Sequence, residues 1–404
     1  MVNTLERRLG LGIVTLYGLG NILGAGIYVL VGKVSGLAGS GTELTFIVAM
    51  IVAAITAFSY MELSSRYPAS ASISVYLHKA FGRRWLSVAI GLTMVASGIA
   101  SAATLSQGFA GYLNSLYNAP TTLASVSLLL ILGLIAIKGI GESAKLAALF
   151  TLVEIFGLLL VIWVGRAAFL GLSPTSVINI DPILGLSGVF SGAFLAFYAF
   201  IGFEDMVNVA EETKDPKRTM PLAILISLIA STVLYLLVVI VATGTLSSAE
   251  LSSSSAPLAD VLERNGSNSR YIISTIGMVA AMNGVVVQLI MGSRILYGLS
   301  KQGWISSKLS IVSRKTGTPI RATSLILGCM ITGTLLLPLI SLAKISSFLV
   351  LSMFCVVNLS LLIIKKESRS QKQHVHFVVP SFVPYLGLLL CSLMIIYELL
   401  ALLG

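Results

Sequence analysis

The chain has 404 residues, of which 56% are hydrophobic and only 10% are charged, and its formal net charge is +10. A soluble domain carries about 25% charged residues, so this composition excludes a water-soluble globule. It predicts an all-α integral membrane protein, because helices satisfy every backbone hydrogen bond within a bilayer.

Apolar stretches follow one another along the whole chain and predict about eleven membrane spans. A helix of about 20 residues crosses a hydrocarbon core of about 30 Å, and most of the stretches are near that length. They lie at roughly 9–32, 44–65, 85–113, 122–137, 146–165, 186–210, 221–244, 271–293, 322–340, 345–364 and 385–403.

The basic residues predict the orientation of these spans. With a cytoplasmic N-terminus, the inside connections hold 21 of the 26 lysines and arginines and the outside connections hold 5, as the positive-inside rule requires. We therefore expect a multi-pass protein of the inner or plasma membrane with an extracytoplasmic C-terminus. A nucleic-acid partner is not expected, since such a partner needs the basic residues gathered on one soluble face.

The first span is rich in glycine at its centre. Four glycines, at positions 18, 20, 24 and 26, fall within nine residues, and each costs about 1 kcal/mol of helix propensity relative to alanine. The pattern predicts an interrupted helix. The alternative is close helix packing, because Gly20 and Gly24 form a GxxxG motif.

The sixth span has a second weak point at residues 198–205, with the sequence YAFIGFED. The two weak points lie five spans apart, so two halves of the chain would cross the membrane in opposite directions. Interrupted spans at corresponding places in inverted halves indicate a binding site at the membrane midplane. The freed amides suit an anion and the freed carbonyls suit an ammonium group, so a zwitterionic amino acid fits such a site.

The remaining segments predict smaller features. The polar stretch 245–270 indicates an outside lid or a short amphipathic helix. Pro380 and Pro384 argue against a helix before Tyr385, where we expect the last span to begin. No cofactor, metal or catalytic residue is expected, because histidines occur at no metal or triad spacing and no nucleotide-binding loop is present.

Two acids inside the apolar spans are candidates for function, since a charge in the membrane costs several kcal/mol unless it is paired or hydrated. Glu154 lies mid-span, and its apolar surroundings favour the neutral carboxyl, so it could bind and release a proton. The alternative for Glu154 is a protonated group that serves packing only. Glu204 follows Gly202 within the second weak point.

The other acids receive structural interpretations. Glu62 precedes Arg66 by four residues, which predicts a salt bridge on one helix face. Asp205 lies on the side of its span that leads to the cytoplasmic end. We expect it to pair with one of the following basic residues: Lys214, Lys217 or Arg218.

Four stretches resemble the motifs of the amino acid–polyamine–organocation (APC) permeases, and they do so in the expected order. They are GNILGAGI at 20–27, FSYMELSSRYP at 58–68, FYAFIGFE at 197–204 leading into EETKDPKRTMP at 211–221, and SRILYGLSKQG at 293–303. The resemblance implies a leucine-transporter-type fold in one transporter domain, 1–404. In that fold five spans (about 9–168) repeat inverted (about 186–365), with broken helices 1 and 6. An extra span follows at about 385–403, whereas the family usually has twelve spans.

The resemblance also implies a site. The backbone amides of Ala25 and Gly26 would hold the substrate carboxylate, and the carbonyls of Ile22, Tyr198 and Ile201 would receive its ammonium group. Tyr198 matches the position of an aromatic gate over the substrate. The other substrate-binding positions at the two weak points are Gly24, Phe200 and Gly202.

The resemblance assigns roles to the two acids as well. Glu154 stands where similar permeases often have a lysine that substitutes for a sodium ion, and Glu204 matches an acid tied to gating or proton coupling. The function predicted is therefore secondary transport of amino acids, with protons as the coupling ion and sodium as the other choice. An exchanger of amino acids or polyamines is the alternative, followed by a channel or a substrate-sensing receptor. Monomer and homodimer both remain open.

Overall fold

The computed structural model describes residues 7–68, 72–138, 144–171, 180–181, 183–266, 268–313, 316–368 and 376–403. Within these ranges the secondary structure is helical, apart from one isolated backbone bridge between Leu9 and Thr213. Four basic residues that entered the topology argument, at positions 314, 315, 369 and 372, lie outside the described residues.

The helices follow one another with short connections. The first half of the chain forms α1 Leu11–Leu23, α2 Ala25–Ala38, η1 Gly39–Gly41, α3 Thr42–Arg66, α4 Ser72–Phe81, α5 Arg84–Tyr117, α6 Thr121–Ile137, α7 Ala144–Val164 and η2 Arg166–Gly171. The second half forms α9 Gly185–Ala196, η3 Phe197–Phe200, η4 Phe203–Glu212, α10 Pro216–Thr245, α11 Ser248–Ser253, α12 Pro257–Arg264, α13 Arg270–Lys301, η5 Ser307–Ser310, α14 Ile320–Leu336, α15 Leu339–Ser368 and α16 Phe382–Leu403.

Seven stretches among the described residues are long and apolar enough to cross a membrane. They are Leu11–Arg66, Arg84–Tyr117, Gly185–Glu212, Pro216–Thr245, Arg270–Lys301, Leu339–Glu367 and Phe382–Leu403. Three shorter apolar helices accompany them: Thr121–Ile137, Ala148–Val164 and Ile320–Leu336. Large side chains such as Leu134, Trp163 and Leu400 are more than half exposed on these helices, as lipid-facing residues would be.

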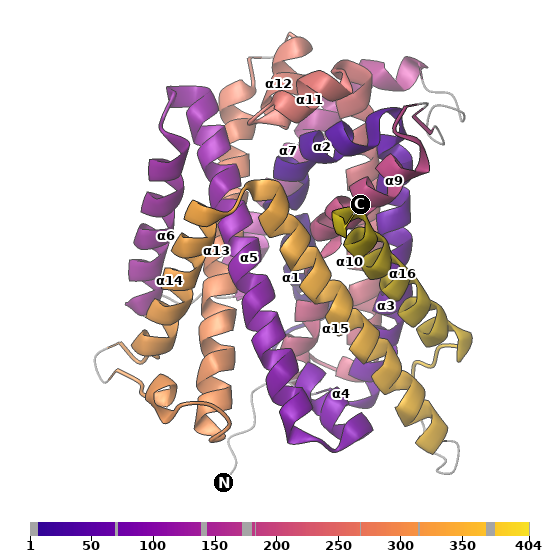
Figure 1. The fold of residues 1–404 in the computed structure, drawn as a ribbon, viewed down its shortest axis with the longest axis vertical. Coiled ribbons are helices and arrows are strands. Elements are labelled where there is room, and N and C mark those ends of the chain that lie inside the picture. The colour runs from indigo at the N-terminus through magenta and orange to yellow at the C-terminus, as the bar shows by residue number, and fades with distance from the viewer. Residues whose placement is uncertain are drawn as a thin grey trace.

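The helices form one bundle whose two ends differ (Figure 1). The short helices α11 and α12 lie at one end, beside the end of α2, and this end is called the lid end. Helix α4 lies at the opposite end, where α1 begins, and this end is called the N-terminal end. In between, α5 packs along α13 and α15, and α10 packs along α1 and α3.

The last helix begins earlier than the sequence predicted. It starts at Phe382 rather than Tyr385, and Pro384 lies in its first turn. Proline is tolerated there because the first N–H groups of a helix have no intrahelical acceptor, so the missing donor costs nothing. Pro384 therefore does not delay the helix.

The predicted salt bridge of Glu62 is confirmed and is part of a larger cluster. Arg66 Nε donates to Glu62 Oε1 at 2.8 Å, and Lys365 Nζ of α15 lies 2.8 Å from Oε2. The backbone N–H of Val379 donates to Oε2 at 2.8 Å. Glu62 is fully buried, so these donors compensate its charge and fix the segment before α16 against α3 and α15.

Candidate functional site

The first span is interrupted at Gly24, within the glycine-rich stretch that predicted it. Gly24 has φ −21° and ψ −169°, which ends α1 at Leu23 and starts α2 at Ala25. Its own N–H still bonds to Gly20 O at 3.2 Å. The first amides of α2 lie at a helix N-terminus, where backbone donors have no intrahelical partner and the helix dipole favours an anion.

The second interruption lies at Ile201 and Gly202, and it contacts the first. Ile201 is extended, and Gly202 has φ 133°, a conformation that glycine adopts and other residues rarely do. A Cβ atom on Gly202 would lie 2.3 Å from Asn21 O, and one on Gly26 would lie 3.0 Å from Ala199 Cα. Both glycines are therefore needed for the two interrupted helices to touch.

Tyr235 of α10 bridges the two interruptions. Its hydroxyl oxygen lies 2.5 Å from Ile22 O and 2.9 Å from Ala199 O, so one proton is shared between carbonyls of the two broken helices. Phe200 packs its ring against Tyr235, with centroids 5.3 Å apart. Tyr235 was not among the predicted site residues, although a lone tyrosine within the apolar stretch 221–244 is a signal for one.

A cavity of about 50 Å³ lies where the interruptions meet, and it is called the central cavity. It is lined by Gly20, Asn21, Ile22, Gly24, Gly26, Ser101, Leu105, Tyr198, Ile201, Gly202, Asp205, Asn283, Gly284, Val287 and Gln288. Six predicted site residues are in this lining: Ile22, Gly24, Gly26, Tyr198, Ile201 and Gly202. Ala25 adjoins it along the chain, whereas Phe200 is buried outside the lining, against Tyr235.

Tyr198, the predicted gate, is held in place from α5. Its hydroxyl lies 2.8 Å from Ser101 Oγ and 3.1 Å from the Ser101 carbonyl oxygen. The side chain is 5% exposed, and both Tyr198 and Ser101 line the central cavity. The ring of Tyr198 is therefore held at the edge of the central cavity by its hydroxyl contacts with Ser101, which lies on α5.

Glu154 of α7 lies one side chain away from the central cavity. Asn283 of α13 lines the cavity, and its Nδ2 donates to Glu154 Oε1 at 3.5 Å. The Tyr28 hydroxyl of α2 donates to the backbone carbonyl of Glu154 at 2.7 Å. Glu154 itself is fully buried. This arrangement connects the acid to both α2 and α13, the helices that border the cavity.

Glu204 and Asp205 of η4 both face the interior. Glu204 Oε2 accepts the N–H of Gly202 at 2.8 Å, so this acid holds the second interruption. Both acids line a cavity of about 20 Å³, called the intermediate cavity, and Asp205 lines the central cavity too.

The predicted pairing of Asp205 with a following basic residue is wrong. Arg218 instead lies 3.9 Å from Asp215, and no described basic residue forms an ion pair with Asp205. The three basic residues all follow the end of η4, whereas Asp205 lies in its first turn. Because a 3-10 helix rises about 2 Å per residue, η4 places them far from Asp205.

A series of neighbouring cavities lies between the site and the N-terminal end. The central and intermediate cavities share Ser101, Ile201, Asp205 and Gln288. The intermediate cavity shares Met94, Met291 and Ile295 with a cavity of about 760 Å³, called the inner cavity. The inner cavity is bordered by exposed residues of α4 and α13, including His78 and Gln302.

The lid end is closed over the site by close packing. A Cβ atom on Gly32 of α2 would lie 2.2 Å from the carbonyl oxygen of Leu251 in α11, so the lid rests directly on the helix. Lys33 Nζ donates to the carbonyls of Ser252, at 2.5 Å, and Ser254, at 3.2 Å. A cavity of about 350 Å³ at this end shares no lining residue with the central cavity.

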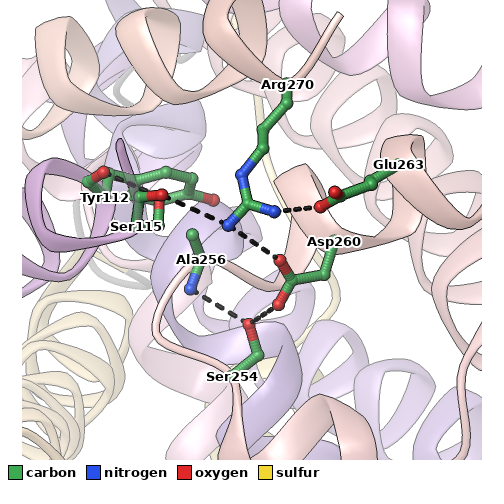
Figure 2. A network of polar contacts seen from close by, with 7 residues as sticks. All are labelled: Tyr112, Ser115, Ser254, Ala256, Asp260, Glu263 and Arg270. Atoms are coloured by element: carbon green, nitrogen blue, oxygen red, sulfur yellow. Dashed lines mark hydrogen bonds and ion pairs between the residues drawn. The ribbon is translucent and has the colours of Figure 1, made fainter. Parts of the chain in front are cut away.

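A polar network fastens the lid to α5 and α13 (Figure 2). The Arg270 guanidinium lies 3.6 Å from Asp260, forms an ion pair with Glu263, and donates to the Ser115 carbonyl at 3.3 Å. Ser254 Oγ donates to Asp260 at 2.5 Å. This group is called the Arg270 network, and it links α12, the start of α13 and the end of α5.

Two interrupted helices that meet at a cavity, inside a helical multi-pass membrane protein, are typical of membrane transporters. Comparison with known families places the chain more narrowly. The model of the amino acid permease family matches residues 9–402, and the chain belongs to this family of the APC superfamily.

Individual relatives differ in the substrate that their names give. The branched-chain amino acid permease BcaP of Bacillus subtilis is 29% identical over 97% of this chain and 88% of its own. The methylthioribose transporter of the same organism is 28% identical over 94% of this chain and 85% of its own. The mitochondrial cationic amino acid transporter 3 of Arabidopsis thaliana is 28% identical over 86% of this chain and 60% of its own. The names therefore leave the substrate class open.

Proposed function

We propose that this protein is a secondary active transporter that carries amino acids by alternating access, as a proton-coupled symporter. The observation that supports it best is the contact between the two interrupted helices around the central cavity. We further propose a leucine-transporter-type fold of about eleven spans in a single domain, 1–404. Its inverted repeats would be about 9–168 and 186–365, with α16 as the extra span. The corresponding positions of the interruptions in the two halves favour it.

The substrate would lie across the two interruptions. In this proposal the amides of Ala25 and Gly26, at the start of α2, hold the carboxylate. The carbonyls of Ile22, Tyr198 and Ile201 receive the ammonium group. Ile22 O already accepts from Tyr235, but a carbonyl oxygen has two lone pairs and can accept a second donor.

The arrangement of cavities favours one stage of the transport cycle. The site connects to the N-terminal end through the intermediate and inner cavities, and the lid end is closed. With a cytoplasmic N-terminus and an extracytoplasmic C-terminus, as the distribution of basic residues predicts, this is the inward-facing stage. The protein would lie in the inner or plasma membrane.

Glu154 and Glu204 are the proposed proton-coupling residues. Glu204 bonds directly to Gly202 at the second interruption. Glu154 bonds to Asn283, which lines the central cavity, and its carbonyl accepts from Tyr28 of α2, the helix that follows the first interruption. Glu154 faces the phenol groups of Tyr28 and Tyr235, and Glu204 faces Asp205. A proton on either acid would change a contact that shapes the central cavity.

Uptake of labelled amino acids into liposomes that contain the purified protein tests the proposal. We expect saturable uptake that an inward proton gradient accelerates, and loss of this acceleration in Glu154→Gln. The matched control is Glu367→Gln, an exposed acid at the end of α15. Uptake that follows a sodium gradient and ignores pH would contradict proton coupling.

The same liposomes separate the alternatives. An exchanger would take up labelled substrate only when the liposomes are loaded with an unlabelled amino acid or polyamine. A channel would show flux that does not saturate, and a receptor would show binding without uptake. Either of the last two results would overturn the proposed transport cycle.

A further inference from the structure

Asp205 presents an uncompensated carboxylate to the proposed substrate site. It is 6% exposed and lines both the central and the intermediate cavity. Among the described residues, none donates a hydrogen bond to its side chain, and no lysine, arginine or histidine lines either cavity. Its charged neighbour is another acid, Glu204.

A buried carboxylate without a partner is costly, so a charge of opposite sign or a proton has to compensate it. Glu204 differs in this respect, because it accepts the N–H of Gly202 at 2.8 Å. Asp205 has no such donor within the part of the chain that the structure describes. The compensating group therefore has to come from outside the protein.

The surroundings of Asp205 offer further acceptors. Asn283, which is 8% exposed, donates its Nδ2 to Glu154, and its Oδ1 has no hydrogen-bond partner among the described residues. The freed carbonyls of the two interruptions add to this set. A cavity with an unpaired carboxylate and an unpartnered amide oxygen is complementary to a ligand rich in N–H donors, such as an ammonium or guanidinium group.

The lining of the intermediate cavity is flexible and apolar beside Asp205. Three methionines, Met94, Met291 and Met353, line it together with Ile295. Methionine is flexible and polarizable, so it adapts to a chain of methylene groups. Lysine and arginine side chains combine such a chain with a cationic end, and that end needs a polar or charged partner.

We propose that Asp205 is the counter-ion of a second cationic group on the substrate, so that the site prefers amino acids with an ammonium or guanidinium side chain over neutral ones. This inference rests on the proposed function, because it places the substrate carboxylate at α2 and its α-ammonium group at the two interruptions. Asp205 then receives the side-chain cation.

Equilibrium binding of radiolabelled L-lysine and L-leucine to the full-length protein in detergent tests the assignment. Removing one partner of a buried charge pair weakens binding steeply, so Asp205→Asn should lower L-lysine affinity by about 30-fold or more. It should change L-leucine affinity by less than about 3-fold, because the backbone groups that would hold the α-carboxylate and α-ammonium stay in place. Asp205→Glu, which keeps the charge, should restore most of the L-lysine affinity.

Asp215→Asn is the matched control, since the same change at a carboxylate that is 62% exposed should leave both affinities unaltered. The assignment is overturned if Asp205→Asn weakens both ligands equally, or if wild-type protein prefers L-leucine. It is also overturned if Asp205→Asn binds L-lysine normally and loses only the pH dependence of uptake, since Asp205 then serves proton coupling. Putrescine lacks the α-carboxylate of lysine. Stronger competition by putrescine than by L-lysine would therefore show that the substrate's α-carboxylate contributes nothing to binding, and would overturn the placement on which the assignment rests.

Binding of L-leucine alone would refute the role of Asp205 and leave the proposed function intact. Binding of no amino acid would refute both. The thermal stability of each variant is measured without ligand. A stability equal to that of the wild type shows that a loss of affinity does not come from unfolding.

Discussion

The two ends of the molecule differ in packing and in chemistry. At the lid end, backbone packs on backbone where Gly32 meets Leu251, and lysine, arginine and acidic side chains fasten the lid. At the N-terminal end, a cavity of about 760 Å³ lies between α4, α5 and α13, and its lining is largely apolar. One end is sealed by close fit and polar contacts, and the other is open.

In the proposed alternating-access cycle, this difference predicts which contacts hold the lid end closed. The ion pairs of the Arg270 network are partly exposed, with side-chain exposures of 29% for Arg270, 35% for Asp260 and 58% for Glu263. Pairs of this kind contribute about 0–1 kcal/mol each. Close packing against backbone atoms tolerates no added methyl group, and overpacking costs about 1–3 kcal/mol. The fit at Gly32 should therefore control closure more strongly than the charges around it.

The largest effect is expected from Gly32→Val. The new side chain would overlap the Leu251 carbonyl oxygen and prevent α11 from resting on α2. At the upper end of the overpacking cost, about 3 kcal/mol, the closed lid becomes about 100-fold less populated, and uptake should fall accordingly.

Uptake into liposomes measures the loss, and hydrogen exchange of residues 248–264 shows whether the lid has opened. Gly328→Val is the control, because a Cβ atom there meets nothing within 4 Å. Normal uptake with slow lid exchange in Gly32→Val would show that the lid closes without this contact.

The features that were readable from sequence are those set by neighbouring residues. Glycines in an apolar span weaken a helix locally, so the interruptions at Gly24 and Gly202 were predictable. The Glu62–Arg66 pair follows from i,i+4 spacing on one helix. The third member of that cluster, Lys365, was not predictable, because α15 is placed beside α3 only by the tertiary fold.

The site residues that were missed depend on rotation and register. Asp205 lines the cavities from the first turn of η4, and nothing in the sequence around it distinguished this 3-10 helix from an α-helix. Tyr235 reaches Ile22 and Ala199 across more than thirty residues of chain, which no local pattern reports. Local helix propensity therefore predicts where the helices are interrupted. Which side chains contact the interruptions depends on how the helices pack.

The next largest effect is expected from Tyr235→Phe, at the centre between the two ends. The change removes the hydroxyl that donates to Ile22 O and Ala199 O and leaves two buried carbonyls with one donor fewer. Stability should fall by about 1–2 kcal/mol. A bound ammonium group can replace the lost donor, so substrate should stabilise this variant more than the wild type.

Thermal unfolding with and without substrate measures both effects. Tyr297→Phe serves as the control, since that tyrosine lies on α13 and lines none of the cavities described above. If substrate stabilised the wild type and Tyr235→Phe equally, the ammonium group would not replace the Tyr235 hydroxyl as a donor to these carbonyls.

A smaller effect is expected from Arg270→Gln, which removes both ion pairs of the Arg270 network at once. Two partly exposed pairs at about 0.5 kcal/mol each give about 1 kcal/mol, so hydrogen exchange of the lid should accelerate about 5-fold. High salt should accelerate exchange in the wild type and have little effect on the variant, because it screens the same pairs. Arg264→Gln, whose guanidinium lies 3.9 Å from Glu250, should change exchange less. An effect of Arg270→Gln as large as that of Gly32→Val would mean that charges, rather than packing, hold the lid.

The smallest effect concerns the pH dependence of the lid itself. Hydrogen bonds from the Ser247 hydroxyl and backbone N–H, with a smaller contribution from Arg264, hold the pKa of Glu250 below its usual range. A lowered pKa in the folded state means that the cap of α11 is fully stable above the ordinary glutamate pKa of about 4.3 and weakens as pH falls through the lowered value. Exchange at residues 248–251, corrected for the intrinsic rate, should accelerate only below about pH 4. In Glu250→Gln the exchange at residues 248–251 should be faster than in the wild type at neutral pH, and it should not change further as the pH falls below about 4. Uptake should change by less than about 2-fold, because one exposed cap contributes little to closing the lid compared with the packing at Gly32.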